Sequence, residues 1–222
     1  MFIVIFFGGN IMRKNRFIFD LDHTLLFADY SAEKEFFRDV FRSDADVFVN
    51  DVVGLLYEYE SLYPRYEVSE LSKFMIDRTR LDFTENIIND WIEVIGNCNS
   101  KIEDGVLETL DFLKSKGMSN AVLTNWFHKS QEMRLRNSGL LEFIDDIYAG
   151  DTILKPRSDA YLSARDRFKS TECVFIGDHL EKDYIGPRSC NMASILYDRD
   201  DRHSDNIIKI KRIDEIKKAL GG

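Results

Sequence analysis

The distribution of apolar residues along the chain predicts strands that alternate with helices. Residues 17–19 form a short apolar run without helical periodicity, which is typical of a buried strand. Similar runs follow later, at residues 120–125, 144–150, 173–178 and 193–198. Apolar residues at three- and four-residue spacing predict helices over residues 106–116, 129–137, 159–168, 181–189 and 213–220. We therefore expect an α/β protein with a doubly wound parallel sheet that helices cover on both faces.

Residues 31–97 follow a different pattern, because helical spacing continues there without an intervening strand. The periodic segments are Ala32–Phe41, Val52–Tyr63, Val68–Arg78 and Thr84–Ile95. Asp82 or Thr84 is the expected cap of the last helix. A segment of this length is too long for a loop in a compact domain. We expect a small helical cap domain over residues 31–97, inserted after the first strand, and a core domain formed by residues 12–30 and 98–222.

The composition is that of a folded chain with an acidic balance. Its 222 residues are 44% hydrophobic and 13% aromatic, which is enough for a sizeable core. The formal net charge of -9 argues against a nucleic-acid partner, and the apolar run at residues 2–7 is too short to span a membrane. We interpret residues 1–11 as an extension, either an additional edge strand or sequence upstream of a start at Met12, and favour the latter. The widely spaced cysteines indicate reduced thiols in a cytoplasmic protein: Cys98, Cys173 and Cys190.

Polar residues stand at or near the carboxyl ends of the predicted strands. In chain order they are Asp20 and Asp22, Thr124 and Asn125, Lys155, and Asp178 with Asp183. Each of them, considered alone, has an ordinary explanation as part of a turn, a loop or a helix cap. The carboxyl ends of parallel strands meet at one edge of the sheet, however, and ligands bind there in this class of fold. We therefore expect all of them to share one site.

The residue types at these positions suit a phosphoryl group and a hard cation. Carboxylates that converge in a water-poor place are costly unless a cation is bound. Oxygen ligands without histidine or cysteine favour Mg²⁺. A lysine and a hydroxyl nearby supply donors for phosphoryl oxygens. One aspartate can attack phosphorus to form an acyl phosphate, and the other can move the protons of the reaction.

These segments together resemble a known family. In this order, "DLDHTL", "LTN", "KP" and "GDHLEKD" are similar to the four motifs of the haloacid dehalogenase (HAD) superfamily. The helical segment between the first and second motifs resembles the branch of that superfamily that carries a helical cap, and the motifs are phosphatase-like. The similarity covers about residues 17–198 and is specific in the core segments.

The resemblance implies roles for the two aspartates and the lysine. By position, Asp20 would be the nucleophile that attacks phosphate and a ligand of Mg²⁺. Asp22 would be the general acid and base, and its backbone carbonyl would contribute to the metal site. Lys155 would neutralise charge on the nucleophile and on the phosphate.

The resemblance also implies a phosphate site and the rest of a metal site. Thr124 would donate to the phosphoryl oxygens, and Asn125 would help to orient them. Asp178 would complete the metal site. Asp183 would be either a further residue at the metal or the partner that holds Lys155.

One position departs from the family pattern. The residue after the second aspartate is often glycine in the family, and here it is His23. We expect the turn either to relax or to place His23 in the left-handed region, with its side chain facing solvent.

Asp22 favours phosphate esters as substrates, because an alkoxide leaves poorly without a proton. We therefore expect a Mg²⁺-dependent phosphomonoester hydrolase acting on a small phosphorylated metabolite. A phosphomutase, a 2-haloacid dehalogenase and a catalytically inactive binding module on the same fold are the alternatives, whereas the order of the motifs argues against a receiver domain. Trp126 is expected near the entrance, and the candidate substrate contacts in the helical segment are Tyr63, Arg65, Lys73, Arg78 and Arg80.

Overall fold

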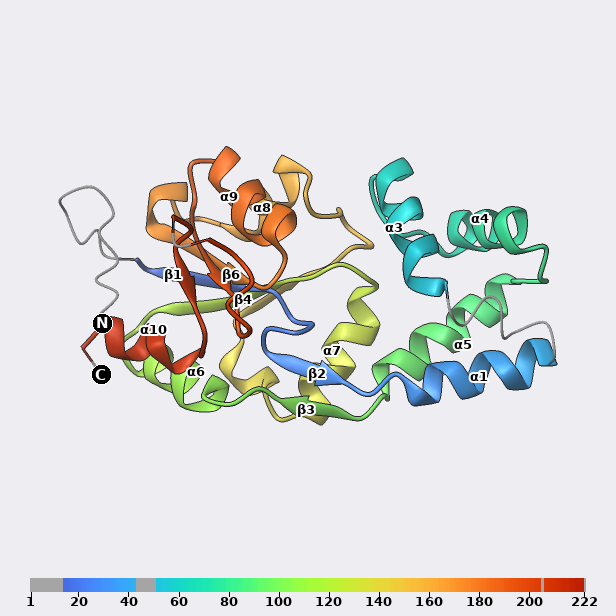
Figure 1. Ribbon diagram of the computed structural model, residues 1–222, viewed down its shortest axis with the longest axis horizontal. Helices are drawn as coiled ribbons and strands as arrows, with labels where there is room; N and C mark the ends of the chain where they lie inside the picture. Colours follow the sequence, from blue (N-terminus) through green and yellow to red (C-terminus); the bar gives the residue numbers. More distant parts are fainter. Residues whose placement is uncertain (1–13, 43–50, 205, 222) are drawn as a thin grey trace.

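A computed structural model describes residues 14–42, 51–204 and 206–221 of the chain. Its central feature is a six-stranded sheet in which all neighbouring strands are parallel (Figure 1). In spatial order the strands are β5 (Asp146–Tyr148), β4 (Ser119–Leu123), β1 (Arg16–Phe19), β6 (Cys173–Gly177), β7 (Ala193–Tyr197) and β8 (Lys209–Ile210). The chain builds outward from β1 in both directions, so the predicted doubly wound parallel sheet is confirmed.

Helices cover both faces of the sheet (Figure 1). One face carries α6 (Val106–Ser115), α7 (His128–Asn137) and α10 (Asp214–Ala219), and the other carries α8 (Ser158–Ala164) and α9 (Gly186–Ser189).

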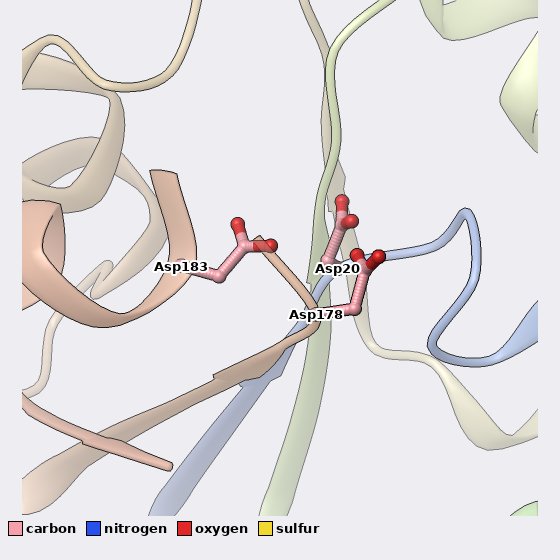
Figure 2. A group of neighbouring side chains, drawn as sticks. All are labelled: Asp20, Asp178 and Asp183. Atoms are coloured by element: carbon pink, nitrogen blue, oxygen red, sulfur yellow. The ribbon is translucent and has the colours of Figure 1, made fainter. Parts of the chain in front are cut away.

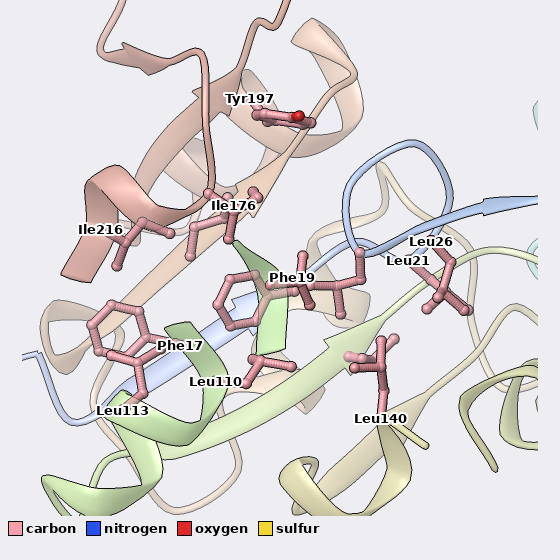
Figure 3. Packing of buried hydrophobic residues seen from close by; sticks show 14 of the residues in the cluster. Phe17, Phe19, Leu21, Leu26, Leu110, Leu113, Leu140, Ile176, Tyr197 and Ile216 are labelled. Carbon is pink, nitrogen blue, oxygen red and sulfur yellow. The ribbon is translucent and has the colours of Figure 1, made fainter. Parts of the chain in front are cut away.

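Successive residues of β1 point to opposite faces of the sheet. Phe17 and Phe19 pack in the cluster that contains residues of α6 and α10 (Figure 3). Ile18 packs on the opposite face against residues of α8. Burial of side chains this large contributes roughly 1.5–3 kcal/mol each. Because both faces are covered, the strands appear in the sequence as continuous apolar runs.

In the described residues between β2 and β3, four further helices lie beyond the carboxyl end of β1 in space (Figure 1). We call them the helical insert: α1 (Ser31–Phe41), α3 (Val52–Leu62), α4 (Val68–Thr79) and α5 (Glu85–Gly96). The insert has its own aromatic core, in which the rings of Phe37 and Trp91 lie 5.0 Å apart between centroids. Trp126 and Phe127, which follow β4, pack into the same core and so join the insert to the edge of the sheet.

Three short strands are absent from the sequence-based prediction. β2 (Leu26–Ala28) and β3 (Ser100–Ile102) pair antiparallel and form the two connections between the helical insert and the rest of the chain. β8 adds an edge to the main sheet. Strands of two or three residues are too short to produce a recognisable alternation of apolar and polar positions.

Two of the predicted helices are wrong in extent. The segment predicted as one helix over 181–189 is a π-helical turn, Leu180–Ile185, followed by the short helix α9. Pro187 occupies the first turn of α9, where its missing N–H removes no helical hydrogen bond. The helix predicted over 159–168 ends at Ala164, and Asp166 just beyond it has a φ of 53°, which is incompatible with a right-handed helix.

The prediction for residues 1–11 lies outside the described residues. Within the described ranges, no helix has both the length and the apolar character that crossing a membrane requires.

Candidate active site

The turn after β1 places Asp20 and Asp22 at the edge of the sheet. The N–H of Asp20 donates to the carbonyl of Ile176 (2.8 Å) and so extends the pairing of β1 with β6 by one residue. The chain then folds back, because the N–H groups of Leu25 and Leu26 both donate to the carbonyl of Leu21. His23 lies in this turn with a φ of 58°, and its side chain is exposed, so the predicted left-handed, solvent-facing histidine is confirmed.

Three carboxylates meet where β1 and β6 end. One oxygen each from Asp20, Asp178 and Asp183 lies within 4.8 Å of the others (Figure 2). Burial raises the pKa of Asp20 well above its usual range, even though Lys155 lowers it, and the neighbouring carboxylates add to the rise. Burial and Asp183 likewise raise the pKa of Asp178. A buried group of carboxylates in need of positive charge fits a hard cation such as Mg²⁺.

Lys155 supplies part of that positive charge. Its Nζ donates to Oδ1 of Asp20 and to Oδ1 of Asp183, at 2.7 Å in both cases. Burial lowers the pKa of Lys155, but the two carboxylates outweigh burial and raise it above its usual value. Of the two roles considered for Asp183, the geometry allows both, because Asp183 pairs with Lys155 and also belongs to the carboxylate group.

Asp183 is held in place by backbone on two sides. Its Oδ2 accepts a hydrogen bond from the N–H of His179 (3.0 Å). A Cβ at position 177 would lie 2.5 Å from the carboxyl carbon of Asp183, so only glycine fits there. Gly177 therefore lets the fully buried Asp183 carboxylate reach the end of β6.

Asp22 is turned toward α7 and is held there by Arg134. The guanidinium donates to both carboxylate oxygens, Nη2 to Oδ1 at 2.7 Å and Nη1 to Oδ2 at 3.0 Å. The hydroxyl of Tyr30 donates to Oδ1 at 2.8 Å. Burial alone would raise the pKa of Asp22, but the charge and hydrogen bonds of Arg134, with that of Tyr30, hold it below its usual value. This arrangement favours the carboxylate form of Asp22.

Thr124 and Asn125 lie at the carboxyl end of β4. Gln131 Nε2 donates to Oγ1 of Thr124 (3.1 Å) and lies 3.4 Å from Oδ2 of Asp22, so it links the two residues. The side chain of Asn125 binds the backbone of Lys155, whose N–H donates to its Oδ1 (3.0 Å). Asn125 thus orients the segment that carries Lys155.

Arg134 and Gln131 were not anticipated from the sequence. Both lie on α7, both are buried, and both look like surface residues because they sit in a strongly polar helix. A signal was present nonetheless, since Leu135 falls four residues after Gln131 and directly after Arg134. A helix that buries Leu135 also turns Gln131, four residues earlier, toward the core, and Arg134 lies three residues after Gln131 on the same face. Tyr30, at the start of α1, was likewise missed.

One cavity of about 280 Å³ connects these groups. It lies between the carboxyl ends of the strands and the helical insert, and all the residues predicted at the strand ends line it: Asp20, Asp22, Thr124, Asn125, Lys155, Asp178 and Asp183. The predicted convergence is therefore present in the structure.

The insert residues named as candidate substrate contacts do not line this cavity. Arg65, Lys73 and Arg78 instead form ion pairs with glutamates on the exposed surface of the insert. Long cationic side chains gain most from solvent-exposed positions, and only packing decides which helix face turns inward. Trp126, expected at the entrance, does line the cavity.

Comparison with known families agrees with this geometry. The family described as haloacid dehalogenase-like hydrolase matches residues 15–191. The chain belongs to this family of hydrolases. The match begins just before β1 and ends just after α9, so it includes the helical insert and every strand-end residue of the site.

A curated protein with a similar sequence is a phosphatase. The ribulose-1,5-bisphosphate 5-phosphatase of Halopiger xanaduensis is 30% identical over 95 residues, which cover 41% of this chain and 40% of that protein. The chain thus matches less than half the length of this relative.

Solved structures of the same fold include a protein described as a HAD-hydrolase and a haloacid dehalogenase. The HAD-hydrolase YfnB from Bacillus subtilis, solved with bound magnesium, has a TM-score of 0.70 at 19% identity, covering 95% of this chain and 100% of that one. The L-2-haloacid dehalogenase of Xanthobacter autotrophicus has a TM-score of 0.71 at 13% identity, covering 95% and 99%. At these identities the similarity establishes the fold of the haloacid dehalogenase family, not the reaction.

Proposed function

We propose that the protein is a Mg²⁺-dependent phosphomonoester hydrolase that acts on a small phosphorylated metabolite through an aspartyl-phosphate intermediate. The observation that carries this proposal is the pair Asp20 and Asp22, which line the same cavity from one turn but have different surroundings. Asp20 lies against Lys155, whereas Asp22 is held by Arg134 and Tyr30. Two carboxylates in such different environments suit two different chemical tasks.

In the first step, a carboxylate oxygen of Asp20 attacks phosphorus, and the bond from phosphorus to the ester oxygen breaks. Lys155 balances the negative charge of Asp20 and of the phosphoryl group. The leaving alkoxide takes its proton from Asp22 in the protonated form, so this step requires a state of Asp22 other than the Arg134-paired carboxylate.

In the second step, Asp22 as a carboxylate removes a proton from water, and the water oxygen attacks phosphorus. The bond between phosphorus and Asp20 breaks, which releases inorganic phosphate and restores Asp20. The surroundings of Asp22 in this structure favour the carboxylate, which is the form that this step needs.

Asp20, Asp178 and Asp183 are the carboxylates that would hold Mg²⁺. The ion, when bound, would neutralise the carboxylates and polarise a phosphoryl oxygen. We place Thr124 at the phosphoryl oxygens and the helical insert over the site as a cap, with the core and cap divided at residues 31 and 97.

Replacing the nucleophile tests the proposal directly. We expect Asp20→Asn to lose phosphate release from a panel of sugar phosphates, phosphoglycolate and nucleotides by at least about a thousandfold, because an amide cannot form the acyl phosphate. Asp111→Asn, an exposed change on α6, serves as the matched control and should retain activity. Circular dichroism checks the fold of both variants, and turnover by Asp20→Asn near the wild-type rate would refute the assignment.

Replacing the acid/base separates phosphatase from dehalogenase chemistry. Asp22→Asn should slow hydrolysis of an alkyl phosphate by roughly 10²–10⁴-fold, while phosphorylation of the protein by acetyl phosphate persists, because that leaving group needs no proton. Halide release from 2-chloropropionate is measured in parallel on the wild-type protein. Halide release without phosphate release would favour the dehalogenase alternative.

A further inference from the structure

The half of the cavity that faces the helical insert contains more carboxylates than amines. We call it the leaving-group pocket, since it lies beyond the strand-end residues, and define it by Glu33, Tyr57, Glu60, Tyr66, Trp91 and Lys182. Two of these side chains are carboxylates and one is an amine; the others are aromatic. The inference drawn from this pocket rests on the proposed function, because a phosphoryl group bound at Asp20 would place the rest of its substrate here.

The only lysine of this pocket is already paired. Lys182 Nζ donates to Oε2 of Glu60 at 2.6 Å and lies 4.5 Å from the centroid of the Tyr57 ring. Both partners of this ion pair are largely buried, with 16% of the Lys182 side chain and 11% of the Glu60 side chain exposed. Tyr66 donates to the other oxygen of Glu60 at 3.0 Å. Lys182 is therefore held as part of the wall.

Glu33 is not part of an ion pair of this kind. Its Oε1 accepts a hydrogen bond from Nε1 of Trp91 at 2.7 Å, but it forms no ion pair with any residue in the described ranges. Burial raises the pKa of Glu33, although the hydrogen bond from Trp91 and the charge of the neighbouring Lys34 lower it. Its carboxyl group retains acceptor capacity beyond the bond from Trp91.

The other cations around the cavity are engaged as well. Arg134 binds both oxygens of Asp22, and Lys155 lies between Asp20 and Asp183. Among the described lining residues, every lysine and arginine therefore has a carboxylate partner. A second phosphate in the leaving-group pocket would meet Glu33 without a lysine or arginine free to pair with it, and an unpaired charge in a buried place is costly.

We propose that the leaving-group pocket selects monophosphates whose organic part carries hydrogen-bond donors, hydroxyl or amine, and no second anionic group. Glu33 accepts from the donor, and the rings of Tyr57, Tyr66 and Trp91 cover the carbon skeleton. This preference differs from that stated in the name of the Halopiger xanaduensis relative, whose substrate is a bisphosphate. Glu33 and Glu60 are thus the residues that determine specificity against a second phosphate.

The test compares two substrates that differ by one phosphate, ribulose 5-phosphate and ribulose 1,5-bisphosphate. We expect kcat/KM of the wild-type protein for the monophosphate to exceed that for the bisphosphate by at least about tenfold, since like charges placed together cost several kcal/mol. Glu33→Gln keeps the acceptor for Trp91 and removes the charge, and Glu60→Gln releases Lys182. Both should reduce this ratio by at least about threefold.

Glu70→Gln is the matched control, because Glu70 lies on α4, pairs with Lys73 and does not line the cavity. It should leave the ratio unchanged. Glycerol 3-phosphate and phosphoethanolamine, tested beside the sugar phosphates, distinguish a hydroxyl donor from an amine. A wild-type protein that turns over the bisphosphate as well as the monophosphate, or a ratio that is the same in all three variants, overturns the proposal.

Binding measurements separate this proposal from the proposed reaction. Calorimetric titration of Asp20→Asn with each ribulose phosphate, in the presence of Mg²⁺, measures binding without turnover, and phosphate release is assayed on the wild-type protein. Tighter binding of the monophosphate without phosphate release would support the pocket and reject the hydrolase mechanism. Equal affinities for the two phosphates, or binding of neither, would overturn the pocket assignment whatever the activity.

Discussion

At the scale of single residues, Asp22 and Arg134 form an ion pair that the sequence pattern did not predict. Arg134 is buried in a helix whose sequence is polar, and its guanidinium pairs with the carboxylate of Asp22 and also donates to Gln131 and Ser100. A buried arginine without that carboxylate would be an unpaired charge, and so would the carboxylate without the arginine. The two residues therefore depend on each other for stability, and Asp22 depends on Arg134 for its orientation.

This dependence predicts the result of a double-mutant cycle. Arg134→Met should lower the free energy of unfolding by about 3 kcal/mol, the lower end of the range for a broken buried pair, because the Asp22 side chain keeps 30% of its surface exposed. In the Asp22→Asn background the same change should cost less, since no carboxylate is left unpaired. Urea unfolding of the four proteins measures the coupling. Strictly additive losses would show that the pair does not act as a unit.

At the scale of elements, α5 illustrates how a local sequence signal positions a residue of the cavity. Thr84 begins α5, and its Oγ1 accepts from the N–H of Ile87 at 3.3 Å. This helix carries Trp91, which holds Glu33 in the leaving-group pocket. Of the two caps considered, Asp82 makes no side-chain hydrogen bond with a described residue at this helix end, whereas Thr84 does.

The cap assignment predicts unequal effects for two neighbouring changes. Thr84→Ala should lower the free energy of unfolding by about 1 kcal/mol, because a backbone N–H of the first turn loses its partner. Asp82→Ala, two residues earlier and exposed, should change it by less than about 0.5 kcal/mol. Thermal or urea unfolding compares the two, and a larger loss for Asp82→Ala would move the cap to that residue.

At the scale of the whole molecule, the site exists because two layers meet over the sheet edge. The sheet places the carboxylates, and residues of the helical insert line the same cavity. Backbone contacts hold the two parts together, such as the N–H of Tyr66 donating to the carbonyl of Gly150 at 2.8 Å. The ionised carboxylate cluster destabilises the folded protein, because burial and mutual repulsion disfavour the charged forms and raise the pKa of Asp20 and Asp178.

Stability should therefore depend jointly on Mg²⁺ and pH. A carboxyl group whose pKa is raised on folding destabilises the folded protein when ionised, and protonation relieves this as the pH falls through the folded pKa. Mg²⁺ relieves the same repulsion and competes with the proton. We expect Mg²⁺ to raise Tm by several degrees at about pH 7.5 and by clearly less at about pH 5.

Differential scanning fluorimetry with and without EDTA measures these shifts. Asp178→Asn should weaken the effect of Mg²⁺ on Tm, because the variant loses one of the three carboxylates. An equal shift at both pH values, or a full shift in Asp178→Asn, would contradict a metal site at these residues.

Much of the fold and site followed from local features of the sequence. Buried parallel strands produce apolar runs, and the polar residues after them lie at one edge of the sheet wherever the helices pack, so the seven strand-end residues could be placed together. β2, β3 and β8 could not be predicted, because strands of two or three residues are stabilised by their pairing partners and not by their own pattern.

The sequence by itself determined the alternation of strands and helices, the insert between the first two motifs and the order of the reactive residues. Only the tertiary structure decided which face of each helix turns inward. Packing made Arg134 and Gln131 part of the site, left Arg65, Lys73 and Arg78 on the surface, and brought Glu33 and Glu60 into the cavity. The physical reason is that a charged residue on a helix is compatible with solvent or with a buried partner, and the partner here is distant in sequence.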